Sequence, residues 1–298
     1  MIIIRFHGGL GNQMFQYSFF QYMKKRYGDL LKADITWFDR NYKEHQGYEL
    51  EKVFGIRLPV ATYEEIAEVH EYYPKYYPCA LLRYLSRRRA AQKNRKRDTS
   101  QNHIYDFGDT QYRYNKIFEN LDVEKDWYIE GVFCSDAYLN YCEEQIKQDF
   151  SFKKPLQGDN VGTVFRMKQE NSVAIHVRRG DYVGNVFDIV GVDYYEAAVE
   201  KIRESVQNPK FYVFSDDMDY VKENFSFLDK YVPMHNRGAD SYLDMQLISC
   251  CKHAVIANSS FSYWGALLGE CSDSIIIAPK KYKADEDVAL ARKNWILL

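Results

Sequence analysis

The sequence predicts an α/β protein with two doubly wound, Rossmann-like domains in tandem. A length of 298 residues suits about two domains at roughly 150 residues each. Short β-branched runs alternate with segments of helical periodicity in both halves of the chain. Between the halves, Ser151 to Asn160 contains Lys, Pro and Gly and is typical of a linker. We therefore expect domains at residues 1–155 and 156–298.

The N-terminal domain opens with the pattern strand, turn, helix, strand. Ile2 to Phe6 is a short β-branched run and is expected to form a buried strand. A glycine-rich turn follows. Asn12 to Arg26 then has apolar residues at helical spacing, with Gly28 as its stop. Leu30 to Ile35 is expected to be the second strand, which completes the usual opening of a doubly wound domain.

The remainder of this domain is less regular. The stretch from Tyr63 to Asn120 gives no clear alternation of strands and helices. Within it, Leu81 to Arg97 carries eight Lys or Arg residues from Arg83 onward. Tyr128 to Phe133 is expected to be a further strand.

The C-terminal domain repeats the alternation. Asp193 and Glu196 have the spacing of a capping box at the start of its first helix. The expected strands are Ser172 to Val177, Phe211 to Phe214, Ala254 to Ala257 and Ile275 to Ala278. The expected helices are Asp193 to Val206, Asp240 to Cys250 and Tyr263 to Leu268.

Composition excludes several classes of protein. The chain has 40 Lys plus Arg against 42 Asp plus Glu, and a net charge of −2 argues against a surface built for nucleic acid. None of the six cysteines forms a C-x-x-C pair. We see no signal peptide and no run of about 18 apolar residues that would span a bilayer. These features favour a cytoplasmic protein with reduced thiols.

Four predicted strand ends carry residues that could bind a ligand, because ligands of open parallel sheets lie beyond the carboxyl ends of the strands. The first is HGGLGNQ, His7 to Gln13. Its glycines let the backbone approach a ligand, and the following helix offers unpaired N–H groups to an anion. Met14 replaces the third glycine of a dinucleotide fingerprint, although Asp34 could mimic its ribose-binding acid. A tight turn without a ligand is the alternative.

The second strand end is HVRRGDY, His176 to Tyr182. Strand alternation sends His176 and Arg178 to one face and Arg179 to the other. Arginine forks onto phosphate oxygens, so this cluster could neutralise a diphosphate. An Arg–Asp ion pair that braces the loop is the alternative.

The third and fourth strand ends are FSDD, Phe214 to Asp217, and NSSFSYWGA, Asn258 to Ala266. A carboxylate of FSDD could bind a guanine edge or ribose hydroxyls. Asp217 and Asp219 also resemble the D-x-D that holds a divalent metal in another class of sugar transferase. The serines of NSSFS offer hydroxyl and N–H groups to phosphate oxygens. Helix capping is the alternative for both.

Together, HGGLGNQMFQY, HVRRGDY, FSDD and NSSFSYWGA resemble the bacterial and animal α1,2-fucosyltransferase family, in order and spacing, along nearly the whole chain. The HxRRxD motif is shared with α1,6-fucosyltransferases. The resemblance implies a GT-B fold with two facing Rossmann-like domains. It also implies an inverting transfer of L-fucose from GDP-fucose to the 2-hydroxyl of a terminal β-galactose on a glycan, without a metal or another cofactor. Animal members carry a membrane anchor; here the chain starts on its first strand, which favours a bacterial cytoplasmic enzyme.

The resemblance also implies roles for residues. It implies that Arg178 binds the β-phosphate and that Asn12 points toward the transferred sugar. It also implies that the N-terminal domain binds the acceptor and the C-terminal domain binds GDP-fucose. From the residues themselves, Asp181 is the first candidate for the catalytic base, with Asp188 behind it, and a reaction without a strong base stays open. The expected donor-binding set is His7, Gly9, Gly11, His176, Arg178, Asp216, Asp217, Asn258, Ser259, Ser260 and Phe261.

Two rival functions remain at this stage. One is a metal-dependent sugar transferase that uses Asp217 and Asp219. The other is a non-enzymatic nucleotide-binding or nucleic-acid-binding protein with a basic arm, which the lack of aromatic–basic alternation disfavours. The Leu and Tyr residues within Leu81 to Arg97 could seat the protein on an anionic membrane surface, near a lipid-linked acceptor. A solvated charged segment is the alternative.

Overall fold

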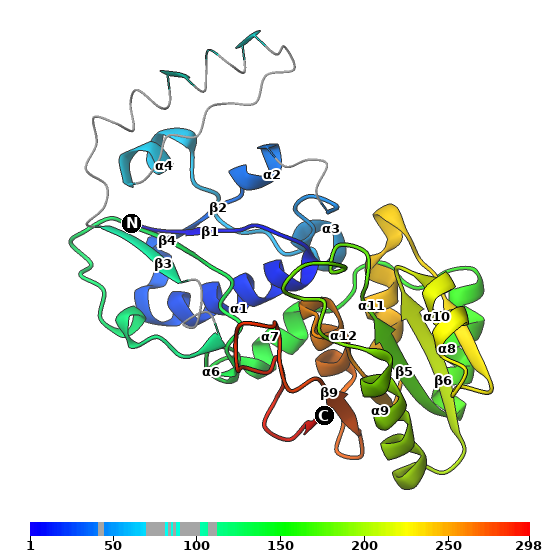
Figure 1. The fold of residues 1–298 in the computed structure, drawn as a ribbon. Helices are drawn as coiled ribbons and strands as arrows, with labels where there is room; N and C mark the ends of the chain where they lie inside the picture. Colours follow the sequence, from blue (N-terminus) through cyan, green and yellow to red (C-terminus); the bar gives the residue numbers. More distant parts are fainter. Residues whose placement is uncertain (41–44, 70–80, 83–84, 86–87, 90–101, 107–111) are drawn as a thin grey trace. The chain divides into compact units, whose positions relative to one another are not determined.

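The structure is a computed structural model that describes residues 1–298 except 41–44, 70–80, 83–84, 86–87, 90–101 and 107–111 (Figure 1). The chain divides into two compact units, Met1–Ser151 and Phe152–Leu298, called unit 1 and unit 2 below. Each unit holds its own parallel sheet. The predicted fold class, α/β with two doubly wound Rossmann-like units, is confirmed.

Unit 1 contains a four-stranded sheet in the order β2-β1-β4-β3. The strands are β1 (Ile2–Arg5), β2 (Leu31–Asp34), β3 (His103–Asp106) and β4 (Trp127–Gly131), and all pairs are parallel. Ile3 and Ile4 are fully buried, as expected for a strand covered on both faces. The strand β3 was not predicted, because its short segment lies in the irregular middle of the chain.

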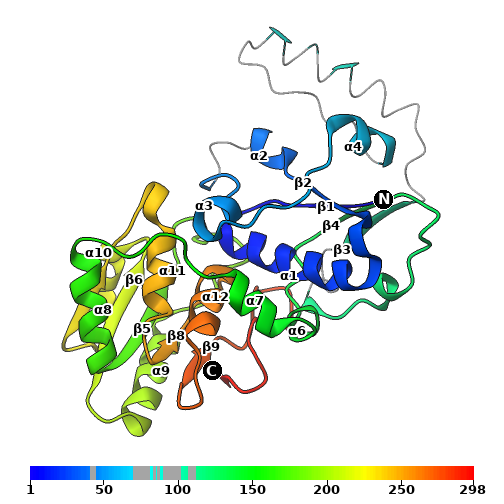
Figure 2. The same ribbon diagram turned by 180° about the vertical axis from the view of Figure 1, so that it is seen from behind.

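Helices cover both faces of this sheet (Figures 1 and 2). The helix α1 (Leu10–Tyr27) packs on one face, and α4 (Tyr63–Val69) packs with Ile3 and Tyr128 on the other. Gly28 ends α1 with φ +61°, the left-handed region that glycine tolerates, as predicted. The other helices of unit 1 are α2 (Thr36–Arg40), α3 (Leu50–Phe54), α6 (Asp136–Asn140) and α7 (Glu143–Asp149), with 3₁₀ turns at Gly28–Leu30 and Lys116–Glu119.

Unit 2 contains a six-stranded sheet in the order β10-β9-β8-β5-β6-β7. Its strands are β5 (Asn171–Val177), β6 (Pro209–Ser215), β7 (Tyr231–Met234), β8 (His253–Val255), β9 (Ile276–Ala278) and β10 (Ile296–Leu297). All neighbouring pairs are parallel. The expected strands β5, β6, β8 and β9 are present, whereas the edge strands β7 and β10 were not predicted.

Alternate residues of the central strands face different helices. Val173, Ile175 and Val177 of β5 pack with α9 (Val192–Ser205) and α10 (Met218–Asn224) in one core cluster. The intervening residues Ala174 and His176 therefore face the opposite side. The remaining helices of unit 2 are α8 (Asp159–Gln169), α11 (Tyr242–Ile248) and α12 (Ser260–Gly269), with a 3₁₀ turn at Gly238–Asp240. The strand order thus brings the ends of β8, β5 and β6 next to one another.

One local prediction in unit 2 is wrong. Asp193 and Glu196 form no capping box, because α9 begins at Val192 and its N-cap residue is Gly191, which makes no side-chain cap. Asp193 lies in the first turn, where its charge favours the helix dipole.

Among the residues that the structure describes, no helix combines the length and apolar character needed to cross a membrane. Most of the basic segment Leu81 to Arg97 lies outside those residues, and its membrane contact stays a prediction.

Candidate functional site

Three of the four strand ends singled out by sequence lie side by side in unit 2. β5 pairs with β6 on one side and with β8 on the other, and all three strands run in the same direction. HVRRGDY, FSDD and NSSFS follow these strands directly, so their loops share one edge of the sheet. The ring centroids of His176 and Phe261 lie 5.8 Å apart, which joins the first loop to the third.

Arg178 is the central cation at this edge. Its guanidinium lies 2.7 Å from Asp181 Oδ1 and 2.9 Å from Asp216 Oδ2, and 5.7 Å from the ring centroid of Tyr182. The side chain is 32% exposed. A guanidinium has five N–H donors, more than these two contacts use. An anion can therefore bind Arg178 without displacing both carboxylates.

Asp216 braces the arginine turn. The backbone N–H of Arg179 donates to Asp216 Oδ1 at 2.9 Å, and that of Gly180 donates to Oδ2 at 3.1 Å. A Cβ atom at position 180 would lie 2.7 Å from Asp216 Oδ2, so the turn requires glycine there. The bracing ion pair that we gave as an alternative is present at Asp216. Its contact with a guanine or ribose stays a prediction.

His176 is buried at the end of β5 and is neutral at pH 7. Burial and the adjacent charge of Arg178 lower the pKa of His176 to about 4, although Asp216 acts in the opposite direction. Its backbone carbonyl accepts a hydrogen bond from the Tyr195 hydroxyl at 3.1 Å. Its Nδ1 has no hydrogen-bond partner among the described residues. A neutral imidazole can donate to or accept from a bound nucleotide without adding charge.

Arg179 turns away from Arg178, as strand alternation predicts. Its guanidinium lies 3.8 Å from the ring centroid of Tyr220 on α10, and its Nε lies 3.7 Å from Asp217 Oδ2. Asp217 Oδ1 accepts the N–H of Tyr220 at 3.0 Å and so caps α10. The capping alternative is thus present at Asp217, and its part in donor binding stays a prediction.

The D-x-D pair has no metal-binding geometry in unit 2. Asp217 is a helix cap, and the fully exposed Asp219 pairs with Lys222 Nζ at 2.9 Å, which lowers the pKa of Asp219. Within the described ranges, no group of three or more His, Cys, Asp or Glu side chains could hold a metal ion.

The loop after β8 is held from both sides. The buried amide of Asn258 donates to the carbonyls of Phe187 at 3.0 Å and Tyr282 at 2.7 Å. The Tyr182 hydroxyl donates to the carbonyl of Asn258 at 3.2 Å and also interacts with the Ser259 side chain. Asn258 thus fixes the loop, while Ser259 is the N-cap residue of α12.

Phe261, in the first turn of α12, packs near His176 of β5. The first N–H groups of a helix lack intrahelical partners and favour anions. Ser259 makes no side-chain cap, so no side-chain oxygen of the N-cap residue competes with an anion there.

The glycine turn of unit 1 depends on Gln13. This fully buried amide donates to the carbonyls of Gly8 at 3.0 Å and Gly47 at 2.9 Å, and its Oε1 accepts the N–H of Glu49 at 2.8 Å. Gly8 has φ +77°, and a Cβ atom there would lie 2.7 Å from Asn12 Nδ2. Glycine is therefore required at position 8, a position that the donor-binding prediction did not include.

The other residues predicted in this turn have different environments. Gly9 is the N-cap residue of α1, and Gly11 lies inside this helix, which begins earlier than predicted. His7 lies 3.2 Å through Nε2 from the carbonyl of Gly131, and burial and the charge of Arg5 lower its pKa to about 4. Their roles, and that of Asn12, in binding the donor stay predictions.

Asp34 does not resemble the ribose-binding acid of a dinucleotide site. It is fully buried, and Oδ1 accepts both the N–H of Thr36 at 2.8 Å and its hydroxyl at 2.7 Å. Oδ2 accepts the Tyr128 hydroxyl. Because these donors engage both carboxylate oxygens, the interpretation of Asp34 as a ribose ligand is wrong.

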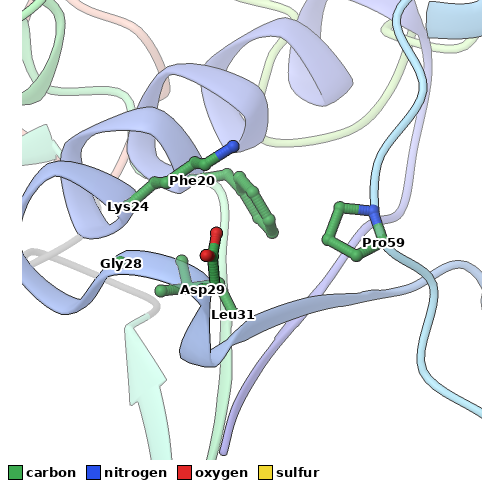
Figure 3. Close-up of a pocket in the computed structure, with 6 residues that line it drawn as sticks. All are labelled: Phe20, Lys24, Gly28, Asp29, Leu31 and Pro59. Carbon is green, nitrogen blue, oxygen red and sulfur yellow. The ribbon is translucent and has the colours of Figure 1, made fainter.

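Sequence reasoning gave no role to Gln13, Gly180 or Tyr182. All three lie inside the quoted motifs, so their presence beside charged residues was visible, but their contacts with distant segments were not. A small hollow lined by Phe20, Lys24, Gly28, Asp29, Leu31 and Pro59 lies at the amino end of β2 (Figure 3). It is far from the strand ends that bind ligands in this class of sheet.

Comparison with known proteins identifies relatives of this chain. An O-antigen biosynthesis glycosyltransferase of Escherichia coli, WbnK, is 26% identical, with 98% of each chain covered. An alpha-1,2-colitosyltransferase of Escherichia coli is 30% identical over 97% of this chain and 94% of its own length. A galactoside alpha-(1,2)-fucosyltransferase 1 of Aotus azarae is 27% identical over 50% of this chain and 44% of its own length.

Solved structures share the fold. NodZ alpha-1,6-fucosyltransferase soaked with GDP-fucose superposes with a TM-score of 0.52 at 16% identity, over 90% of this chain and 92% of NodZ. NodZ from Bradyrhizobium gives a TM-score of 0.51 at 14% identity, over 90% of this chain and 93% of NodZ. The GT-B assignment is confirmed at the level of fold.

The family itself follows from the sequence. The sequence model of glycosyl transferase family 11 matches residues 1–298, the whole chain. The resemblance to α1,2-fucosyltransferases, drawn from the four strand-end motifs, is confirmed. The arginine turn, the braced serine loop and the full-length match lead to one conclusion: the chain belongs to glycosyl transferase family 11.

Proposed function

We propose that this protein transfers L-fucose from GDP-fucose to the 2-hydroxyl of a terminal β-galactose on a glycan, with inversion at the anomeric carbon. Family membership and the names of its relatives support a glycosyltransferase that uses a sugar of this type. The acceptor is proposed from the relatives that act on galactosides.

The observation that carries the proposal is the position of Arg178. A partly exposed guanidinium lies near the buried neutral His176 and against the ring of Tyr182, whose hydroxyl donates to Asn258 in the loop before α12. Negative charge develops on the departing diphosphate during glycosyl transfer, and fixed donors stabilise it. Arg178 and the amides of the loop after β8 supply such donors without a metal.

Two carboxylates are candidates for the base that accepts the proton of the acceptor hydroxyl. Asp181 lies 2.7 Å from Arg178, and Asp188 Oδ2 accepts the N–H of Gly184 at 2.9 Å. We propose Asp181 because it is 56% exposed and lies against the cation that would face the donor phosphates. Comparing Asp181→Asn with Asp188→Asn tests it, since only the first should lose turnover.

The direct test is release of GDP from GDP-fucose, followed with a panel of galactosides in the presence of EDTA. Sugar transfer with α1,2 linkage, detected by product mass and linkage analysis, is the expected result. Transfer abolished by EDTA would instead favour the metal-dependent rival with Asp217 and Asp219. Steeply salt-dependent nucleic-acid binding without any transfer would favour the binding-protein rival.

A second donor is favoured by one comparison. The alpha-1,2-colitosyltransferase is 30% identical over nearly the full chain. Colitose is fucose without its 3-hydroxyl, so the two donors differ by one hydrogen-bonding group. Measuring kcat/KM with GDP-fucose and GDP-colitose side by side decides between them.

We also propose a cytoplasmic enzyme that works near a lipid-linked acceptor, as O-antigen relatives suggest. In the described part of the basic segment, Leu81, Leu82 and Leu85 are 63%, 48% and 43% exposed. Sedimentation with anionic liposomes tests this contact. Pelleting that weakens with salt supports it, and the absence of pelleting rejects it.

A further inference from the structure

Two neighbouring buried polar groups in unit 1 lack hydrogen-bond partners among the residues that the structure describes. Glu49 is 3% exposed, and its Oε1 has no hydrogen-bond partner among the described residues. The hydroxyl of the adjacent Tyr48 is also buried and lacks a partner in the same part of the chain. Buried polar atoms are nearly always hydrogen-bonded, because an unmet one costs free energy. Two on consecutive residues indicate a place where a ligand completes the bonding.

The loop that carries these groups is attached to the glycine turn after β1. Gln13 bonds the carbonyl of Gly47 and the N–H of Glu49, so the backbone on both sides of Tyr48 is held by one buried amide. A Cβ atom at Gly9 would lie 3.2 Å from His45 Nδ1, so the loop also closes on the N-cap of α1. The orphaned groups therefore lie at the ligand-binding edge of the unit 1 sheet.

Aromatic rings surround this loop. The ring of the half-buried Trp37 lies 6.3 Å from that of His7 and 6.4 Å from that of His45, between centroids. Phe38 follows Trp37 and lies 5.7 Å from the Tyr48 ring. An aromatic face packs on the apolar face of a sugar ring, while oxygen atoms beside it bind the hydroxyls.

The charge of this region suits a neutral ligand. His7 is uncharged at pH 7, because burial lowers its pKa to about 4. Burial raises the pKa of Glu49 to about 7, with Lys52 opposing the shift. A carboxyl group repels a phosphate when ionised and accepts hydrogen bonds from hydroxyls. The Glu49 carboxyl of unit 1 therefore suits the hydroxyls of a polyol, whereas the Arg178 guanidinium of unit 2 suits a diphosphate.

We propose that Glu49, Tyr48 and Trp37 form a subsite within unit 1 for a neutral sugar ring of the glycan acceptor, with Glu49 accepting hydrogen bonds from its hydroxyls. The inference rests on the proposed function and assigns residues to its acceptor. It predicts that these side chains control acceptor affinity and leave donor affinity alone.

The test measures KM for acceptor and donor separately, with lactose, Gal-β1,4-GlcNAc and Gal-β1,3-GalNAc as acceptors and GDP-fucose as donor. Glu49→Gln and Trp37→Leu are expected to raise the acceptor KM about tenfold or more and to leave the GDP-fucose KM within about twofold. Glu51→Gln, two positions along on the exposed side of α3, is the matched control and is expected to behave as wild type.

The outcomes separate two failures. A wild-type protein that releases no GDP with any galactoside rejects the proposed function. An active wild type whose Glu49→Gln variant keeps its acceptor KM, or changes both KM values equally, overturns only the acceptor subsite.

Stability distinguishes a ligand-binding Glu49 from a structural one. Its folded pKa of about 7 lies above the ordinary value of 4.5, so the native protein holds an extra proton between these values and loses stability as pH rises through them. The charged group that acts on Glu49 is Lys52 of α3, and the packed helix α1 contributes the neutral Gln13. Glu49→Gln should lack this loss, so its Tm relative to wild type rises from pH 5 to pH 8. A variant less stable than wild type at pH 8 makes Glu49 structural and overturns the proposal.

Discussion

The turns after β1 and β5 hold the same place in their two sheets but are built from opposite chemistry. After β5, Arg178 and Arg179 are held by Asp216 and Asp217, and Arg178 keeps an exposed edge. After β1, the neutral amide of Gln13 fixes the backbone. We infer from this difference that the two units, although of one fold class, serve the unlike ligands proposed above, a diphosphate in unit 2 and a neutral polyol in unit 1.

The largest effect is expected from removing the positive charge of the turn after β5. Arg178→Ala removes the cation that would stabilise the departing diphosphate, and turnover should fall by on the order of 10²–10³. The fold should persist, because Asp216 still accepts the N–H groups of Arg179 and Gly180. Steady-state kinetics with thermal melting checks both points, and Arg203→Ala on α9 is the control. A folded variant with near wild-type turnover would end the assignment of Arg178.

The fall in stability at low pH tests the buried histidines of both units. Burial lowers the pKa of His7 and His103 in unit 1 and of His176 in unit 2 to about 4. The unfolded chain then binds more protons, so stability falls as pH drops from about 6.5 to 4. The buried His176 contributes to this loss in unit 2.

The contribution of unit 1 is measured through His103. Its Nε2 lies 4.0 Å from Glu130, but burial and Arg5, which holds Glu130 at 2.7 Å, keep its pKa low. His103→Gln should flatten the fall of Tm between pH 7 and pH 5. An unchanged slope in this variant would contradict the argument.

A smaller effect, on the free energy of unfolding, is expected from removing the Gln13 amide of unit 1. Gln13→Ala leaves two carbonyl groups and the N–H of Glu49 without their partner, which should cost about 2–4 kcal/mol of unfolding free energy. Urea denaturation measures this cost, with the exposed Gln145→Ala as control. A loss of less than about 0.5 kcal/mol would show that the turn does not depend on this amide.

The smallest effect tests the metal-dependent rival. Asp219 is fully exposed and pairs only with Lys222 among the ion pairs seen in the described residues. Asp219→Asn should leave turnover within about twofold of wild type, because exposed pairs contribute little. A large loss that added divalent metal restores would favour the rival.

Local pattern was sufficient for much of the fold. The segments that became β1, β5 and β6 are short apolar runs rich in β-branched or aromatic residues, and glycine stops α1 where it was expected. The short strands β3, β7 and β10 were not predicted, because each is stabilised by pairing with a distant strand rather than by its own residues.

By itself, the sequence determined the family, the α/β class and the motifs at the strand ends, since these depend on residue type and local spacing. Only the tertiary structure decided that β8, β5 and β6 are neighbours, that Asp216 braces the arginine turn and that Glu49 is buried with an unpaired oxygen. The physical reason is that each of these facts joins residues far apart along the chain, and no local pattern records which distant donor a carboxylate meets.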